Sequence, residues 1–298
     1  MKENTAEQIT VLEDLTDYWT DRAHSYSAQN LAEMNDWRRD AWRELILEHA
    51  PKKECLRILD VGTGPGFFAI NLALAGHKVT AIDVTEHMIW HAKRNAESYG
   101  AEVDFQVQRG EFLPFEADSF DLIVSRNVIW NLEYPKEALA EWARVLAPGG
   151  RMVYFDANWY LYLYDEELRA RREAALADFA ARHSSYHTAN NLSPKRIKGL
   201  EQTARSLPLS RKKRPEWDRE VLQALNMDIL RIIDDIGPGV QDPIEWERDA
   251  PIHTFMVCAQ KGAAVDTDGK GKCAVRSGGR YGVAGGAEGS AVYPELSG

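Results

Sequence analysis

The chain has 298 residues, of which 44% are hydrophobic and 28% are charged, and its formal net charge is -10. This length and apolar content suffice for one large or two small domains with a buried core. The acidic balance disfavours nucleic acid as a partner, because a phosphate backbone attracts basic surfaces. No apolar run approaches the ~20 residues that a membrane-spanning helix needs, and the N-terminus lacks the apolar segment of a signal peptide.

The three cysteines, Cys55, Cys258 and Cys273, lie far apart in the chain and form no CxxC pair. This spacing argues against a disulfide framework and against a zinc site, and it fits a reducing compartment. His87 and His91 stand four residues apart, but no third ligand accompanies them, so we interpret them as solvated side chains. We therefore expect a cytoplasmic protein that binds no metal.

Residues 5–49 are predicted to be helical, because Ile9, Leu12, Leu15 and Trp19 recur at three- and four-residue spacing. A strand–turn–helix–strand unit follows between residues 56 and 83. Its first apolar run ends at Asp60 before a glycine-rich turn, and its second ends at Asp83. Such a unit opens a doubly wound α/β sheet, in which ligands bind past the carboxyl ends of the strands.

The glycine spacing of the turn indicates which ligand it serves. A dinucleotide fold requires Gly-x-Gly-x-x-Gly, whereas this turn contains Gly62, Gly64 and Gly66, with Pro65 inside it. The carboxylate of Asp60 and the proline suit a ligand that has a cationic end and no phosphates, and the glycines allow close backbone approach. Asp83 can accept from both hydroxyls of a ribose. Taken alone, the motif could also be a glycine-rich turn without a ligand.

Further strands are predicted at 103–107, 119–125, 151–156, 228–233 and 253–259, with a helix at 136–146 that ends at a Pro-Gly-Gly stop. Between residues 157 and 227 the α/β alternation is interrupted by helices. From residue 262 onward ten of 37 residues are glycine and no periodicity remains, which predicts a disordered tail. We expect three regions: helices at 1–50, an α/β domain at 51–261 with the helical insertion, and the tail at 262–298.

The order of motifs resembles the class I S-adenosylmethionine (SAM)-dependent methyltransferases of the small-molecule type, similar to the type 11 and ubiquinone/menaquinone-biosynthesis enzymes. The glycine turn, Asp83, Leu-Pro-Phe at 113–115 and Arg-Val-Leu-x-Pro-Gly-Gly at 144–150 carry this resemblance. It implies a Rossmann-like, seven-stranded doubly wound sheet whose last strand is antiparallel. It also implies an N-terminal helical lid over the cofactor and a helical insertion after the fifth strand that covers the substrate.

The resemblance implies SAM as cofactor, and the expected cofactor-binding residues are Asp60, Gly62, Thr63, Gly64, Gly66, Asp83, Val84, Met88, Gly110, Glu111 and Asn127. In the family an aspartate usually accepts from the adenine amino group where this chain has Arg109. Glu111 or a backbone carbonyl would have to substitute for it. Met88 would stack on adenine, although a core methionine would leave the same pattern.

Tyr26, Trp130 and Trp159 are the expected substrate contacts, and the aromatic cluster at 159–164 is expected to form the substrate wall with them; helix packing is the alternative. No catalytic residue is assigned. Asp156, His183 and His187 are the candidate bases, and each could equally be structural or solvated. The basic run at 195–219 could attract an anionic substrate or form a solvated face.

The predicted function is methyl transfer from SAM to a small apolar, aromatic or cationic acceptor. A non-catalytic SAM-binding or scaffold subunit is the alternative. A nucleic-acid methyltransferase is less favoured. DNA enzymes that methylate amino groups have an Asn/Asp-Pro-Pro-aromatic turn after the fourth strand, whereas residues 126–129 contain no proline. Enzymes that methylate a cytosine carbon use a Pro-Cys nucleophile, whereas neither Cys55 nor Cys258 follows a proline. Arsenite methylation would need clustered thiolates that the chain lacks. The sequence predicts no oligomeric state.

Overall fold

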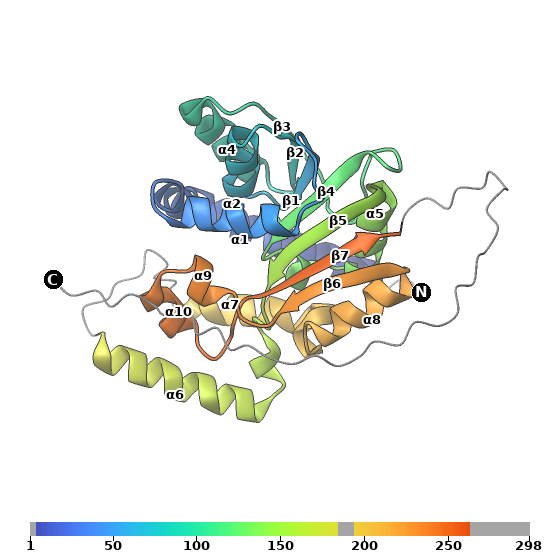
Figure 1. The fold of residues 1–298 in the computed structure, drawn as a ribbon. Helices are drawn as coiled ribbons and strands as arrows, with labels where there is room; N and C mark the ends of the chain where they lie inside the picture. The colour runs from blue at the N-terminus through green and yellow to red at the C-terminus, as the bar shows by residue number, and fades with distance from the viewer. Residues whose placement is uncertain (1–3, 184–193, 263–298) are drawn as a thin grey trace, which may run out of the picture. The chain divides into compact units, whose positions relative to one another are not determined.

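The computed structural model describes residues 4–183 and 194–262, which form an α/β fold around one mixed sheet (Figure 1). Within these residues the sheet has seven strands in the order β3-β2-β1-β4-β5-β7-β6. The strands are β1 (Arg57–Val61), β2 (Lys78–Asp83), β3 (Val103–Val107), β4 (Phe120–Arg126), β5 (Leu146–Asp156), β6 (Met227–Ile233) and β7 (Phe255–Lys261). The first five pair in parallel, whereas β7 is antiparallel to both β5 and β6. The predicted Rossmann-like sheet and its antiparallel last strand are therefore confirmed.

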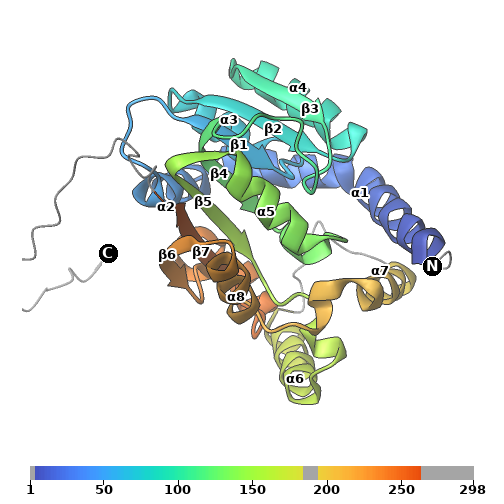
Figure 2. The ribbon, with the colours of Figure 1, turned by 90° about the vertical axis from the view of Figure 1, so that its right-hand side faces the viewer.

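Helices cover both faces of the sheet (Figures 1 and 2). The longer helices are α1 (Asn4–Met34), α2 (Arg38–His49), α3 (Phe67–Leu74), α4 (Glu86–Tyr99), α5 (Pro135–Val145), α6 (Glu166–Arg182), α7 (Pro194–Ser206) and α8 (Glu216–Ala224). Two short helices, α9 (Gly237–Val240) and α10 (Pro243–Asp249), lie between β6 and β7, where none was predicted. Among the described residues, no helix combines the length and the apolar character required to cross a membrane.

The alternation of side chains along the central strands explains why both faces need cover. Ile58 of β1 packs into a core with Trp42, Phe68 and residues of α4, whereas its neighbour Leu59 packs into a second core with Trp142 of α5 and residues of α8. Both β1 residues are fully buried. A strand that is buried on both faces has a continuous apolar sequence, and the residues before the glycine turn have this pattern.

The fifth strand begins earlier than predicted. We expected a glycine stop and a strand at 151–156, but β5 starts at Leu146. The backbone is already extended at Leu146, directly after α5, and Leu146 pairs with Phe120 before the register shifts between Phe120 and Leu122. Pro148 and Gly149 thus lie inside an irregular strand rather than in a loop before it.

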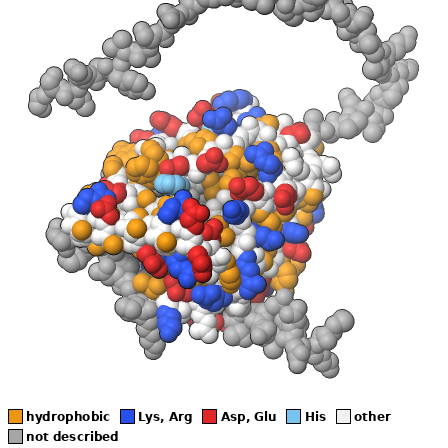
Figure 3. All heavy atoms as spheres, turned by 90° about the horizontal axis from the view of Figure 1, so that it is seen from below, with side chains coloured by type: hydrophobic (Ala, Val, Ile, Leu, Met, Phe, Trp, Pro, Cys, Tyr) orange, Lys and Arg blue, Asp and Glu red, His pale blue; other side chains and the backbone are white. Residues whose placement is uncertain are grey.

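The predicted helical insertion after the fifth strand is present. It contains the 3-10 helix η2 (Leu161–Leu163), α6, α7, the 3-10 helix η3 (Pro208–Arg211) and α8. In both ribbon views α6 lies far from β2 and β3. The basic run within the insertion is not uniformly solvated, because Arg214 is buried whereas Lys212 and Lys213 are exposed. On the face seen from below, Lys and Arg are interspersed with Asp and Glu (Figure 3).

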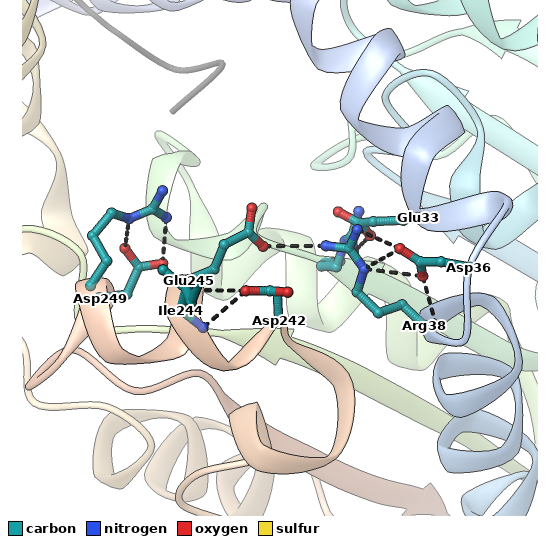
Figure 4. A network of polar contacts seen from close by, with 9 residues as sticks. Glu33, Asp36, Arg38, Asp242, Ile244, Glu245 and Asp249 are labelled. Atoms are coloured by element: carbon teal, nitrogen blue, oxygen red, sulfur yellow. Dashed lines mark hydrogen bonds and ion pairs between the residues drawn. The ribbon is translucent and has the colours of Figure 1, made fainter. Parts of the chain in front are cut away.

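An ion-pair network ties the N-terminal helices to α10 (Figure 4). Arg38 at the start of α2 donates to Asp36 at 2.6 Å and to Glu245 of α10 at 3.3 Å. The side chain of Asp242 caps α10 by accepting from the amides of Ile244 and Glu245. The residues that follow this helix line the cavity described below, so the network connects that wall to α1 and α2.

Candidate active site

A cavity of about 620 Å³ lies past the carboxyl ends of the parallel strands, and α1, η2, α6 and α7 contribute to its walls. Its sheet side includes Gly62, Gly64, Asp83, Val84, Met88, Gln108, Arg109, Gly110, Glu111, Asn127, Val128 and Glu133. Its helical side includes Trp130, Trp159, Tyr160, Tyr162, Arg172, Leu176, Ile197, Leu200 and Ile252. The volume is in the range of small-molecule sites.

The glycine turn approaches the cavity through two of its three glycines. Gly62 and Gly64 have φ angles of +67° and +54°, a region that side chains disfavour. A Cβ on Gly62 would collide with Val128, and one on Gly64 would lie 3.3 Å from the ring of Tyr26. Tyr26 of α1 thus lies close over the turn, and it lines the cavity.

Asp60, Thr63 and Gly66, three of the expected cofactor contacts, are not among the residues that line the cavity. Asp60 is 2% exposed and accepts from the hydroxyl of Thr63 at 2.6 Å and from the amide of Ala69 at 3.1 Å. Burial raises the pKa of Asp60 to about 7. A Cβ on Gly66 would lie 3.2 Å from the Cβ of Ala92, so this glycine allows α3 to pack on α4. The contacts of these three residues lie within the turn and the helices next to it.

Asp83 ends β2 beside the turn and lines the cavity. One carboxylate oxygen accepts from the amide of Gly64 at 2.9 Å, and the other accepts from the amide of Thr85 at 2.9 Å. Burial raises the pKa of this carboxyl. Since each carboxylate oxygen has two acceptor sites, both oxygens retain capacity for ribose hydroxyls. Val84 and Met88 line the cavity next to Asp83, as expected.

The segment after β3 carries an ion-pair cluster that the sequence did not predict. Arg109 lies 3.2 Å from Glu111 and 3.0 Å from Glu133, a residue 24 positions later in the chain. Both glutamate side chains are more than nine-tenths buried, and Oε1 of Glu133 has no hydrogen-bond partner. Gly110, between Arg109 and Glu111 in the sequence, accepts a hydrogen bond from the indole of Trp142 through its backbone carbonyl. The cluster brings two carboxylates to the place where the family's single aspartate was expected.

Asn127 follows β4 with a φ of +60°, a strained conformation for a residue other than glycine. Its backbone N–H donates to the carbonyl of Phe155 at 2.8 Å, and its backbone carbonyl accepts from the indole of Trp130 at 3.0 Å. The side-chain oxygen Oδ1 is buried without a partner. Strain of this kind is often stored at ligand sites, and the orphaned oxygen can accept from a ligand ammonium.

Trp130 and Trp159, the two expected substrate tryptophans, both line the cavity. Trp130 packs against Tyr160 with ring centroids 5.2 Å apart, and Tyr160 packs against Tyr162 at 6.1 Å. Tyr160 and Tyr162 belong to the aromatic cluster at 159–164 that the sequence places in the substrate wall, and both line the cavity. A short turn after β5 brings them to the same side as Trp130.

A buried polar network supports Trp130 from behind. Asp156 at the end of β5 accepts from the amide of Trp130 at 3.0 Å and pairs with Arg214 at 2.5 Å. Arg214 also pairs with Asp218 at 2.7 Å, and Asp218 accepts from the hydroxyl of Tyr154. All four side chains are almost completely buried. Burial raises the pKa of Asp156, and the guanidinium of Arg214 opposes that rise.

Of the three candidate bases, the two that the structure describes do not line the cavity. Asp156 belongs to the buried network, and His183 lies 3.3 Å from Glu247 at the end of α6; neither residue lines the cavity. His187 lies outside the described residues. In the described part of the chain, no group of three or more His, Cys, Asp or Glu side chains could hold a metal ion. The ring of His91 packs against those of Trp90 and His24.

Arginine 22 of α1 is a further residue that sequence reasoning missed. It is 8% exposed, lines the cavity and forms no ion pair with any described residue. A buried guanidinium without a counter-ion is costly, so an anionic ligand group would stabilise it. It stands one helical turn before Tyr26, which covers Gly64.

Known proteins resemble the part of the chain that forms the sheet side of this cavity. A sequence profile described as a methyltransferase domain matches residues 59–154. Demethylmenaquinone methyltransferase of Thermus thermophilus is 40% identical over 122 residues, which cover 40% of this chain and 53% of that protein. Malonyl-[acyl-carrier protein] O-methyltransferase of Erwinia pyrifoliae is 38% identical over 112 residues, which cover 37% of this chain and 41% of that protein. The chain thus spans about half the length, or less, of these curated relatives.

Solved structures agree on the fold. A chain from the complex between the Haloferax volcanii Trm112 methyltransferase activator and the putative methyltransferase has a TM-score of 0.52 at 18% identity, with 82% of this chain and 97% of that chain covered. Phosphoethanolamine N-methyltransferase 2 of Haemonchus contortus, in complex with SAM, has a TM-score of 0.51 at 18% identity, with 79% and 52% covered. Residues 59–154 therefore match the methyltransferase-domain family, and the chain shares the fold of these SAM-dependent methyltransferase structures.

Proposed function

We propose that this chain is an enzyme that binds SAM on the sheet side of the cavity and transfers its methyl group to a small-molecule acceptor on the helical side. The observation that carries the proposal is the set of unsatisfied groups around the glycine turn. Asp83 has spare acceptor capacity for a ribose, Asn127 has an orphaned oxygen for an ammonium, and Arg22 lacks an anion. These groups match the ribose and the amino-acid end of SAM.

In this proposal Gly62, Gly64 and Asp83 hold the ribose end of the cofactor, Met88 packs against the adenine, and Asn127 and Arg22 bind the amino-acid end. Bound SAM supplies a methyl group that is already electrophilic because it is attached to a sulfonium. The chain's own contribution is orientation and exclusion of water, effects that can lower a barrier by several kcal/mol. Tyr26 above the turn and the tryptophans of the helical side provide that enclosure.

A dedicated base is not part of the proposal. The acids that line the cavity are Asp83, Glu111, Glu133 and Asp249. Glu111 and Glu133 share Arg109, and Asp249 pairs with Arg248. We expect an acceptor atom that needs little help with its proton, such as an amine, a thiol or an acidic oxygen or carbon.

The named relatives are a demethylmenaquinone methyltransferase and a malonyl-[acyl-carrier protein] O-methyltransferase, and their partial coverage leaves the acceptor of this chain open. We place the reaction in the cytoplasm, because Cys55 and Cys258 are free and far apart. We also propose that α1 and α2 act as the lid of the site.

The test is incubation of the protein with methyl-labelled SAM and a small-molecule extract, together with calorimetry of S-adenosylhomocysteine binding. We expect binding and at least one labelled small-molecule product. Binding without any labelled product would favour the non-catalytic SAM-binding or scaffold subunit instead. Absence of binding would exclude both functions.

A further inference from the structure

The helical side of the cavity contains an aromatic ladder that ends in a guanidinium. Trp130, Tyr160 and Tyr162 form the ladder, with ring centroids 5.2 Å and 6.1 Å apart and interplanar angles of 41° and 35°. The guanidinium carbon of Arg172, from α6, lies 4.3 Å from the centroid of the Tyr162 ring. All four residues line the cavity, so the ladder leads from the end of β4 towards α6.

The last ring of the ladder is fixed in place. The hydroxyl of Tyr162 donates to Glu201 of α7 at 2.8 Å, and its carbonyl accepts from the side chain of Arg169 at 3.3 Å. A guanidinium stacked on a fixed ring uses its face for the stack and keeps its N–H edges for ligands. Arg172 is therefore oriented before any ligand arrives, which lowers the entropy cost of binding one.

The cavity-lining arginines differ in whether the chain supplies a counter-ion. Three have carboxylate partners: Arg109 with Glu111 and Glu133, Arg126 with Glu33, and Arg248 with Asp249. Arg22 and Arg172 form no ion pair with any residue whose side chain is described, at 12–183 and 197–262. The single carboxylate of bound SAM can neutralise one of them. Arg22 is the one beside Tyr26 and the glycine turn, which leaves Arg172 for another anion.

We propose that the methyl acceptor is an aromatic acid: its ring packs along Trp130, Tyr160 and Tyr162, and its carboxylate or phosphate binds the N–H edge of Arg172. This inference rests on the proposed function and names the substrate class of the same site. Planar guanidinium edges match carboxylate and phosphate oxygens in pairs, which gives geometric selection as well as affinity. A neutral or cationic aromatic acceptor would leave Arg172 without a counter-ion.

The experiment uses the full chain, methyl-labelled SAM and a small-molecule extract, with products separated on an anion-exchange resin at pH 8. We expect the main labelled product to be retained, and phosphatase treatment to abolish retention of a phosphate but not of a carboxylate. Arg172→Gln should lower the yield of that product by about 10- to 100-fold, the range that charge-assisted hydrogen bonds contribute. The affinity of the Arg172→Gln protein for S-adenosylhomocysteine, measured by calorimetry, should stay unchanged. That result would show that the variant is folded.

Arg171 provides the matched control, because it is the neighbouring residue of α6, is exposed and pairs with Glu167. Arg171→Gln should not change the yield. Arg172→Lys keeps the charge but loses the planar edge, so it should restore only part of the yield. A labelled product that the resin does not retain would overturn the aromatic-acid proposal and leave methyl transfer intact. An acidic product whose yield is the same with Arg172→Gln would also overturn it, and the absence of any labelled product would overturn the proposed function itself.

Discussion

The sheet side and the helical side of the cavity are built in different ways. The sheet side uses backbone and short side chains at strand ends, such as Gly64 and Asp83, which are held by hydrogen bonds to one another. The helical side uses large side chains from the insertion, such as Tyr160 and Arg172, which are held by ring packing and a buried ion-pair network. We infer that the first side fixes a common cofactor, whereas the second determines which acceptor this chain accepts. The following predictions test that division.

The largest expected effect comes from the network behind the helical side. Arg214→Met would leave Asp156 and Asp218 buried without their cation, because both carboxylates pair with this guanidinium. Breaking such a buried pair costs about 3–5 kcal/mol, so the free energy of unfolding should fall by that amount in urea titrations. Lys212→Met, at an exposed neighbouring position, is the control and should change it little. A loss below about 1 kcal/mol for Arg214→Met would show that the network does not support the acceptor wall.

The second prediction tests whether the carboxyl group of Asp60, in the turn on the sheet side, is protonated in the folded chain. The pKa of Asp60 is raised to about 7 in the folded chain by burial, from an ordinary value of 3.8. The folded state therefore keeps a proton between pH 4 and 7 that the unfolded state has lost. The stabilising contribution of Asp60 is present below its unfolded pKa and falls as pH rises, by about 1.4 kcal/mol per pH unit, until it levels off near pH 7.

Asp60→Asn should remove the pH-dependent contribution of Asp60 to the free energy of unfolding. An amide oxygen can accept from Thr63 and Ala69 without titrating. The measurement is the difference in unfolding free energy between wild type and variant from pH 4 to pH 7.5. A difference that is independent of pH would show that Asp60 is ionised in the folded chain.

The third prediction separates the two sides directly. Trp159→Ala should misplace the acceptor and lower kcat by about 100-fold, a typical cost of a small misplacement, because Trp159 lines the cavity after β5. The affinity for S-adenosylhomocysteine should change less than threefold, since the sheet side is intact. If Trp159→Ala lowered cofactor affinity and the melting temperature together, the tryptophan would be a packing residue.

The difference between the two sides also explains what the sequence could predict. The sheet side follows from local patterns, because the ends of parallel strands meet at one edge. Even there, Asp60 and Gly66 belong to the turn and not to the cavity wall, a distinction that spacing alone does not contain. Arg172 could not be selected, because on a charged helix it has the same pattern as a solvated residue. Glu133 escaped notice because its contact with Arg109 joins residues 24 positions apart.

The fourth prediction concerns the cofactor's ribose. Asp83→Ala removes both carboxylate acceptors and should weaken S-adenosylhomocysteine binding by about 1–3 kcal/mol, the cost of leaving the hydroxyls unpaired. The variant also loses the acceptors for the amides of Gly64 and Thr85, so its melting temperature must be measured beside the calorimetry. Asp83→Asn, which keeps one oxygen, should lie between wild type and Asp83→Ala. Equal affinity in all three proteins would place the ribose elsewhere.

The smallest expected effect addresses the one place where the sheet side departs from its family. Arg109 occupies the position of the expected adenine acceptor, and it holds Glu133, whose Oε1 is buried without a partner. If that oxygen accepts from the adenine amino group, Glu133→Gln should weaken S-adenosylhomocysteine binding by about 1–2 kcal/mol.

The decisive comparison for Glu133 uses S-inosylhomocysteine, which has a carbonyl in place of the amino group and cannot donate there. Wild type should bind it more weakly than S-adenosylhomocysteine, and Glu133→Gln should lose most of that preference, because the glutamine side chain can donate to the carbonyl through its NH₂ group. Glu116→Gln, at an exposed position outside the cavity, is the control and should keep the wild-type preference. A preference that is equally strong in Glu133→Gln would assign adenine recognition to Glu111 or to the backbone at Gly110. The division of the cavity would then hold, with the adenine recognised by the segment after β3.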